Sequence, residues 1–189
     1  MAGILDTIRQ KQGDTQKSAS WYRNAIGNLR STPTARKLMN QGRLNSRPSA
    51  GRLNLFFYDP KTKNKLPYYD RFPLTIPVEP ADGGFRGINL HYLPPVLRAK
   101  FLDALLNVTN NKKYDDTTKF RLTYRLLKGA RNMRYFKPCL KHYLLEHVRS
   151  RFAEVPAPEW EIATFLPTAQ WTKASAGRVY QDSRKAING

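Results

Sequence analysis

The clearest alternation of apolar and polar positions lies in residues 51–95. Short apolar runs are separated there by turn residues at 59–64 and 82–84. The pattern predicts strands at 52–58, 72–78 and 85–93. Pro73 and Pro77 confine the second of these to a sheet edge or to a bulge. Because short antiparallel strands need a partner face, we expect a small sheet covered by helices, and a barrel-like closure is one form that it could take.

Helical spacing of apolar residues follows the sheet region. Helices are predicted to begin at Pro94-Pro95, at Thr118 and at Pro138, with a short one at 159–166. The helix after Pro138 is inferred from Leu140, Leu144 and Val148, which are spaced four residues apart. The fold class is therefore α+β, with a small antiparallel sheet followed by about three helices.

The first 50 residues contain few large apolar side chains and many Ser, Thr, Asn, Gln, Arg and Lys. A short helix is predicted around 19–29, and turn residues fill the rest. We therefore expect residues 1–50 to be an extended basic arm that orders on a partner, with Trp21, Ile26 and Leu38 as docking residues. A flexible terminus without a role is the alternative. The predicted domain spans residues 51–166, and residues 167–189 form a polar tail.

The positive charge of the chain is concentrated in two segments. Lys and Arg number 33 against 14 Asp and Glu, which gives a net charge of +19. Residues 1–52 carry +8 and residues 117–152 carry +9, whereas residues 53–116 carry +2. Such clustering favours binding to a polyanion or to an acidic protein surface, and a solvated basic face without a ligand is the simpler interpretation.

Candidate binding residues follow from this distribution. In the second segment the basic residues are interleaved with Phe120, Tyr124, Tyr135 and Phe136. Basic side chains neutralise phosphates and aromatic rings stack on unpaired bases, although the same rings could be core residues. The candidates for contact with nucleic acid or with an acidic partner are Arg36, Lys37, Arg43, Arg47, Lys119, Arg121, Arg125, Lys128, Arg131, Arg134 and Lys137.

No residue pattern in the chain indicates a catalytic, metal or cofactor site. His142 and His147 are five residues apart, which is the wrong helical spacing for shared ligation. No glutamate is followed two residues later by lysine, as a common nuclease core requires, and no glycine-rich phosphate loop is present. Cys139, the one cysteine, is expected to be a small core residue. We therefore expect no enzyme activity, no cofactor, no small-molecule substrate and no membrane span.

Five stretches within residues 51–173 carry a family resemblance. They are YDPKTKNKLPYYDRFPLTIPVEP, GFRGINLHYLPPVLRAKFLDAL, KYDDTTKFRLTYRLLK, RYFKPCLKHYLLEHVRS and EWEIATFLPTAQW. They resemble virion proteins of T-even-like contractile-tailed bacteriophages, a group that includes DNA end protectors and unassigned structural proteins.

The resemblance implies a non-enzymatic virion protein that assembles in the host cytoplasm. Such a protein would bind DNA or neighbouring virion subunits in the neck, where DNA, head and tail meet. One alternative is a tail or baseplate component that binds only proteins through its basic residues. Another is a nuclease of head completion.

Overall fold

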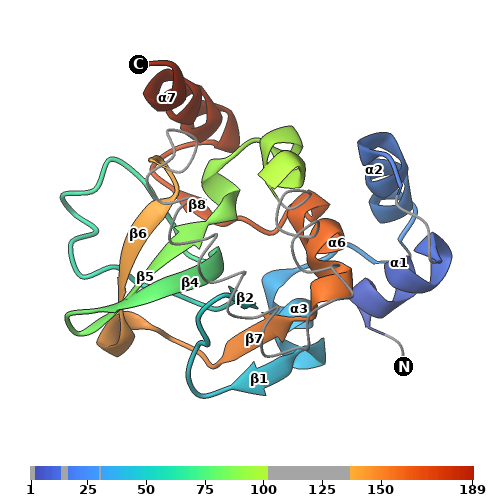
Figure 1. Ribbon diagram of the computed structural model, residues 1–189, viewed down its shortest axis with the longest axis horizontal. Coiled ribbons are helices and arrows are strands. Elements are labelled where there is room, and N and C mark those ends of the chain that lie inside the picture. Colours follow the sequence, from blue (N-terminus) through green and yellow to red (C-terminus); the bar gives the residue numbers. More distant parts are fainter. Residues whose placement is uncertain (1–2, 14–16, 30, 102–136) are drawn as a thin grey trace, which may run out of the picture.

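The computed structural model describes residues 3–13, 17–29, 31–101 and 137–189. Its centre is a six-stranded antiparallel sheet in the order β1-β7-β2-β4-β5-β6 (Figure 1). The strands are β1 (Arg43–Asn45), β2 (Leu53–Leu55), β4 (Leu74–Ala81), β5 (Gly84–Asn89), β6 (Leu140–Leu144) and β7 (Phe152–Val155). A separate pair joins β3 (Tyr69–Asp70) to β8 (Trp171–Thr172). In the part of the chain that the structure describes, β1 and β6 remain edges, so the sheet is open rather than barrel-like.

The β4–β5 hairpin forms where the sequence pattern places it. Gly83 occupies its turn with a φ of 68°, a backbone conformation that glycine adopts without steric cost. The register between the two strands shifts between Pro77 and Glu79, which is the bulge expected from a proline inside a strand. The hairpin, the strand β2 and the sheet confirm the predicted α+β class.

Apolar side chains cover both faces of the sheet. Alternation along β5 places Ile88 in the main core, where it lies across from Ile76 of β4. Phe85 points to the opposite face, where a second cluster of aromatic side chains forms. That cluster consists of Phe56, Tyr58, Phe85, Tyr143 and Phe152, and its rings pack largely edge to face.

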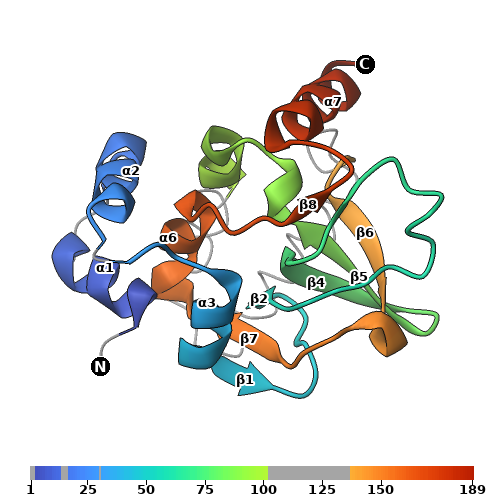
Figure 2. The ribbon, with the colours of Figure 1, turned by 180° about the vertical axis from the view of Figure 1, so that it is seen from behind.

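Residues 3–45 differ most from expectation. The predicted extended arm is wrong for the described residues, which form α1 (Ile4–Gln12), α2 (Ala19–Gly27), α3 (Ala35–Gln41) and β1. The helix expected around 19–29 is confirmed as α2. Both α1 and α2 lie beside α6 (Trp160–Phe165), itself a predicted helix, as both views show (Figures 1 and 2).

Tertiary contacts explain why these short segments are helical. Ile4 and Ile8 lie one turn apart and are both buried in the main core. Tyr22 stacks on Phe165 with ring centroids 5.1 Å apart, and its hydroxyl donates to a carboxylate oxygen of Glu161 at 2.8 Å. Isolated helices this short are marginal in water, so packing against α6 supplies most of their stability.

The predicted helix at 138–148 is also wrong. Residues Leu140–Leu144 form the edge strand β6, followed by a 3₁₀ turn at Leu145–His147. A separation of four residues fits a strand as well as a helix, because it equals two strand periods of two residues and is close to one helical turn of 3.6 residues. Pairing with β5, which places Phe85 opposite Tyr143, favours the strand.

The C-terminal segment is more ordered than a polar tail. Residues Ala176–Asn188 form α7, whose N-cap Ser175 accepts a hydrogen bond from the backbone N–H of Arg178. Val179, Ser183 and Ile187 give the helix one buried stripe. The division of the chain at residues 51 and 166 stays a prediction. The helix expected after Pro94 is present at residues 95–101, and the one expected from Thr118 lies outside the described residues. None of the described helices is long and apolar enough to cross a membrane.

Replacing Gly84 with alanine is expected to destabilise the β5–β6 pairing. A Cβ atom there would lie 1.8 Å from the backbone oxygen of Tyr143, so the two strands would have to separate. Overpacking typically costs about 1–3 kcal/mol, and a backbone clash leaves little room to relax. Gly27→Ala is the matched control, since no atom lies within 4 Å of its added Cβ. Equal unfolding midpoints in urea for the two variants would contradict the described pairing.

Candidate nucleic-acid interface

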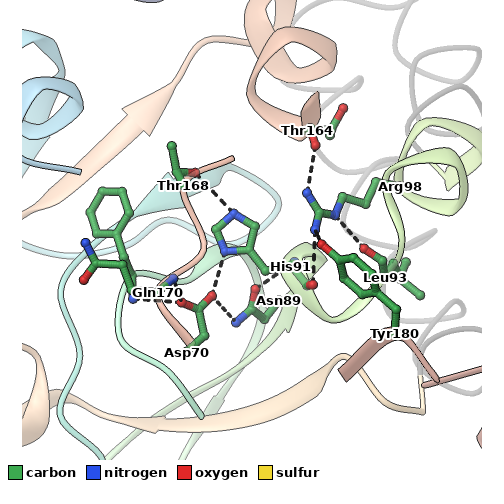
Figure 3. Close-up of polar contacts among 10 residues, drawn as sticks. Asp70, Asn89, His91, Leu93, Arg98, Thr164, Thr168, Gln170 and Tyr180 are labelled. Atoms are coloured by element: carbon green, nitrogen blue, oxygen red, sulfur yellow. Dashed lines mark hydrogen bonds and ion pairs between the residues drawn. The ribbon is translucent and has the colours of Figure 1, made fainter. Parts of the chain in front are cut away.

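A buried polar network surrounds Asp70 (Figure 3). One carboxylate oxygen accepts from the backbone N–H groups of Phe72 and Gln170, each at 3.0 Å. The other accepts from the side-chain amide of Asn89 at 3.2 Å and contacts Nδ1 of His91 at 2.6 Å. Four partners therefore satisfy this carboxylate, and they come from segments far apart in the sequence.

The network holds an ionised aspartate against a neutral histidine. Burial lowers the pKa of His91 and outweighs the opposing effect of Asp70. Burial alone would raise the pKa of Asp70, but the His91 interaction and the two backbone N–H donors lower it below its ordinary value. Neutral His91 then donates from Nδ1 to Asp70, and its Nε2 faces the Thr168 hydroxyl at 3.4 Å.

Arg98 extends this polar core to the helices. Its guanidinium donates to the carbonyls of Leu93 at 2.7 Å, Thr164 at 2.8 Å and His91 at 3.2 Å, and to the Tyr180 hydroxyl at 2.8 Å. Burial lowers the pKa of Arg98. These bonds tie residues 95–101 to α6 and α7, and the side chains of His91 and Asp70 are 0% and 1% exposed. The network therefore fixes the fold rather than meeting a substrate.

Cys139 is buried, as the sequence predicted, and burial raises the pKa of its thiol to about 12. Its thiol therefore stays protonated at neutral pH. Within the described ranges, no group of three or more His, Cys, Asp or Glu side chains is placed to hold a metal ion.

The predicted basic residues occupy separate places. Arg36 and Lys37 lie in the first turn of α3, Arg43 lies on the edge strand β1, and Arg47 follows that strand. All but the half-buried Lys37 are exposed. Lys137 precedes β6, at the opposite edge of the sheet, so the structure does not bring it to the first group. Lys119, Arg121, Arg125, Lys128, Arg131 and Arg134 lie outside the described residues.

The predicted docking residues of the arm point into the protein. Leu38 is buried in the main core, and Trp21 and Ile26 are half-buried against it. Trp21 packs edge-on against Tyr22 with ring centroids 5.2 Å apart. Docking on a partner stays a prediction, and it applies to the exposed parts of Trp21 and Ile26.

A further basic feature is the turn at residues 59–66, here called the basic turn. It belongs to the long loop that joins β2 to β3 and projects beside β6 (Figures 1 and 2). Lys61, Lys63 and Lys65 are exposed on it at alternate positions. The sequence predicted a turn at 59–64, but its lysines were not among the predicted binding residues, because the surrounding segment, with +2, is nearly neutral on average. The spacing Lys-x-Lys-x-Lys was the signal that could have revealed them.

More basic residues adjoin the start of the basic turn. The backbone N–H of Asp59 donates to the carbonyl of His147 at 3.1 Å, and that of Arg149 donates to the carbonyl of Phe57 at 2.8 Å. Lys63 is the largest cause of the lowered pKa of Asp59, and Arg149 and His147 add smaller effects. The Asp59 carboxylate is therefore surrounded by positive charge, and the local balance is basic.

A family model described as the phage T4 terminal DNA protecting protein matches residues 4–187. The chain belongs to this family. No significant match was found among curated proteins or among solved structures.

The family match confirms the resemblance found in residues 51–173 and extends it to both ends of the chain. It includes the helices α1 to α3, the basic turn and most of α7. The strongly basic composition of the chain is consistent with membership of a family described as terminal DNA protecting.

Proposed function

We propose that this protein binds the phosphate backbone of phage DNA at its ends and shields those ends without catalysing a reaction. The observation that carries the proposal is the match to a terminal DNA protecting family over residues 4–187. The net charge of +19 supplies the physical means, because Lys and Arg neutralise phosphates and release counterions.

The contacts that we propose are mainly to the backbone of DNA. Phosphate contacts position a protein on DNA and carry little sequence information. Among the predicted basic residues that the structure describes, Arg36, Arg43 and Arg47 are exposed and suited to this role. The proposed location is the virion, at the head–tail region where the DNA end lies, in contact with neighbouring structural proteins.

An exonuclease experiment tests the proposal. Linear duplex DNA is incubated with the protein and then with a double-strand exonuclease that starts at free ends. Bound protein is expected to slow digestion strongly at saturation, because it covers the ends. A restriction enzyme that cuts the middle of the same fragment should act at its normal rate.

Two controls separate shielding from other effects. The protein with Mg²⁺ or Mn²⁺ and no exonuclease should leave the DNA full-length. Metal-dependent cutting that Asp59→Ala or Asp116→Ala abolishes would favour the nuclease instead. Unchanged exonuclease digestion at saturating protein would contradict end protection.

A further inference from the structure

The basic turn is held in one conformation by its own hydrogen bonds. The backbone N–H of Lys63 donates to the carbonyl of Pro60 at 3.2 Å. Those of Lys65 and Leu66 donate to the carbonyl of Thr62 at 2.9 and 3.2 Å. The Lys63 ammonium also contacts both Asp59 carboxylate oxygens, at 3.0 and 3.1 Å. The lysine side chains of the turn therefore project from a defined backbone.

Lys173, more than 100 residues further along the chain, clamps this turn. Its ammonium donates to the carbonyl oxygens of Lys63 at 2.6 Å, Asn64 at 3.3 Å and Leu66 at 3.1 Å. An ammonium has three N–H donors, so these three bonds use all of them. All three donors of the Lys173 ammonium therefore bond to backbone carbonyls of the basic turn. The turn itself carries three exposed lysines.

Lys173, which makes these hydrogen bonds, has an uncommon backbone conformation. Its φ is 70°, and it is the one non-glycine residue with a positive φ among the described residues. Such a conformation persists only where the surrounding structure fixes it. The preceding strand β8 supplies that restraint, because it pairs with β3 and because Gln170 just before it donates to the buried Asp70.

Charge at the turn favours an anionic partner. The carboxylate of Asp59 pairs with Lys63, and the structure assigns no ion pair to Lys61 or Lys65 within the described residues. Arg71 joins the same region, because its backbone carbonyl accepts from Tyr58 and its backbone N–H donates to Gln170. Arg149 lies close enough to Asp59 to lower its pKa. An approaching polyanion would meet several cations and few uncompensated carboxylates.

We propose that the basic turn is a phosphate-binding element for the DNA backbone, with Lys61 and Lys65 as contacts and Lys173 as a positioning residue. This inference rests on the proposed function and adds to it a specific surface. Ammonium groups act on phosphate as point charges, so the element would not read sequence. An acidic protein surface is the competing partner, and the experiment below separates the two.

The test compares Lys61→Gln/Lys65→Gln with the full-length wild type in filter binding to duplex DNA across a salt series. Each lost phosphate contact lowers the slope of log affinity against log salt by about 0.9. Losing two contacts should therefore reduce the slope by roughly 1.8, and the affinity loss between 50 and 200 mM salt should become about tenfold smaller. Lys11→Gln/Arg23→Gln, on α1 and α2 at the far end of the molecule, is the matched control and should keep the wild-type slope (Figures 1 and 2).

Lys173→Met tests the clamp separately. It keeps the aliphatic stem and removes the three hydrogen bonds, so trypsin should cut faster after Lys61 and Lys65. DNA affinity should fall about twofold to tenfold, because binding must then include the free-energy cost of ordering the turn. The salt slope should stay near that of the wild type, because Lys61 and Lys65 are still present. Lys173→Arg, which keeps donors at the position, should restore much of the affinity.

The outcomes distinguish this inference from the proposed function. If the wild type binds DNA and the Lys61→Gln/Lys65→Gln variant keeps its full slope, the basic turn does not contact DNA and the proposed function stands. If the wild type fails to bind at 50 mM salt, the proposed function itself is wrong. Wild-type affinity and wild-type trypsin cleavage in Lys173→Met would overturn the role of the clamp.

Discussion

Asp70→Ala is expected to lower the free energy of unfolding by at least about 3 kcal/mol, because four buried donors lose their acceptor and each unsatisfied buried group costs about 1–3 kcal/mol. The substitution leaves Nδ1 of His91, the amide of Asn89 and two backbone N–H groups without their acceptor. Urea denaturation followed by circular dichroism measures the change. Asp82→Ala, in the exposed β4–β5 turn, is the matched control and should shift stability by less than about 0.5 kcal/mol.

The same network predicts how stability depends on pH. The pKa of His91 is lowered in the folded protein, so the unfolded chain binds more protons once the pH falls below about 6.5. Stability should therefore decrease as the pH drops below that value. The pKa of Asp70 is lowered as well, so a second loss should begin below about pH 3.9.

Two variants separate this behaviour from general acid unfolding. His91→Gln should flatten the part of the stability curve that begins near pH 6.5, whereas His142→Gln, at an exposed position, should leave it in place. A small effect of Asp70→Ala, below about 1 kcal/mol, would contradict the described network.

The second large effect concerns salt. If about 6–10 phosphates are neutralised, affinity for duplex DNA should fall roughly 10³–10⁵-fold between 50 and 200 mM salt. The base sequence of the duplex should matter little, because the contacts are to its backbone. Filter binding of the full-length protein to two unrelated sequences across the salt series measures both properties.

A charge-reversal variant tests the basic residues predicted from the sequence. Replacing Arg121, Arg125, Arg131 and Arg134 with Glu changes the net charge of the chain by eight units and is expected to abolish binding. The urea midpoint of the variant serves as the control for folding. Affinity that is insensitive to salt would contradict phosphate contact, and failure to bind at 50 mM would favour an acidic protein partner.

Local patterns were sufficient for part of the fold. Turn chemistry at Asp82-Gly83 and the proline at 77 predicted the β4–β5 hairpin and its bulge. Apolar spacing located α2 and α6 within a few residues. These elements are encoded by residues close together in the sequence, so reading one segment at a time was adequate for them.

The features that were missed, namely the burial of particular side chains and the elements β6 and α7, depend on distant partners. Tyr22 is buried because its hydroxyl donates a hydrogen bond to Glu161 and its ring stacks on Phe165. Leu140–Leu144 is a strand because it pairs with β5. The buried stripe of α7 includes Ser183, which a hydrophobic pattern does not count. The clamp of Lys173 on the basic turn joins residues more than 100 positions apart, and no local signal encodes it.

Competition between DNAs of equal mass and different end number tests the central claim most directly. Limiting protein is mixed with a labelled linear duplex and then with one unlabelled competitor, supplied either intact or cut into several fragments by a blunt-cutting enzyme. If the protein recognises DNA ends, the fragmented competitor should displace the label more effectively, in proportion to its number of ends. Equal displacement by the intact and fragmented competitors would show that the protein binds duplex along its length and would contradict end recognition.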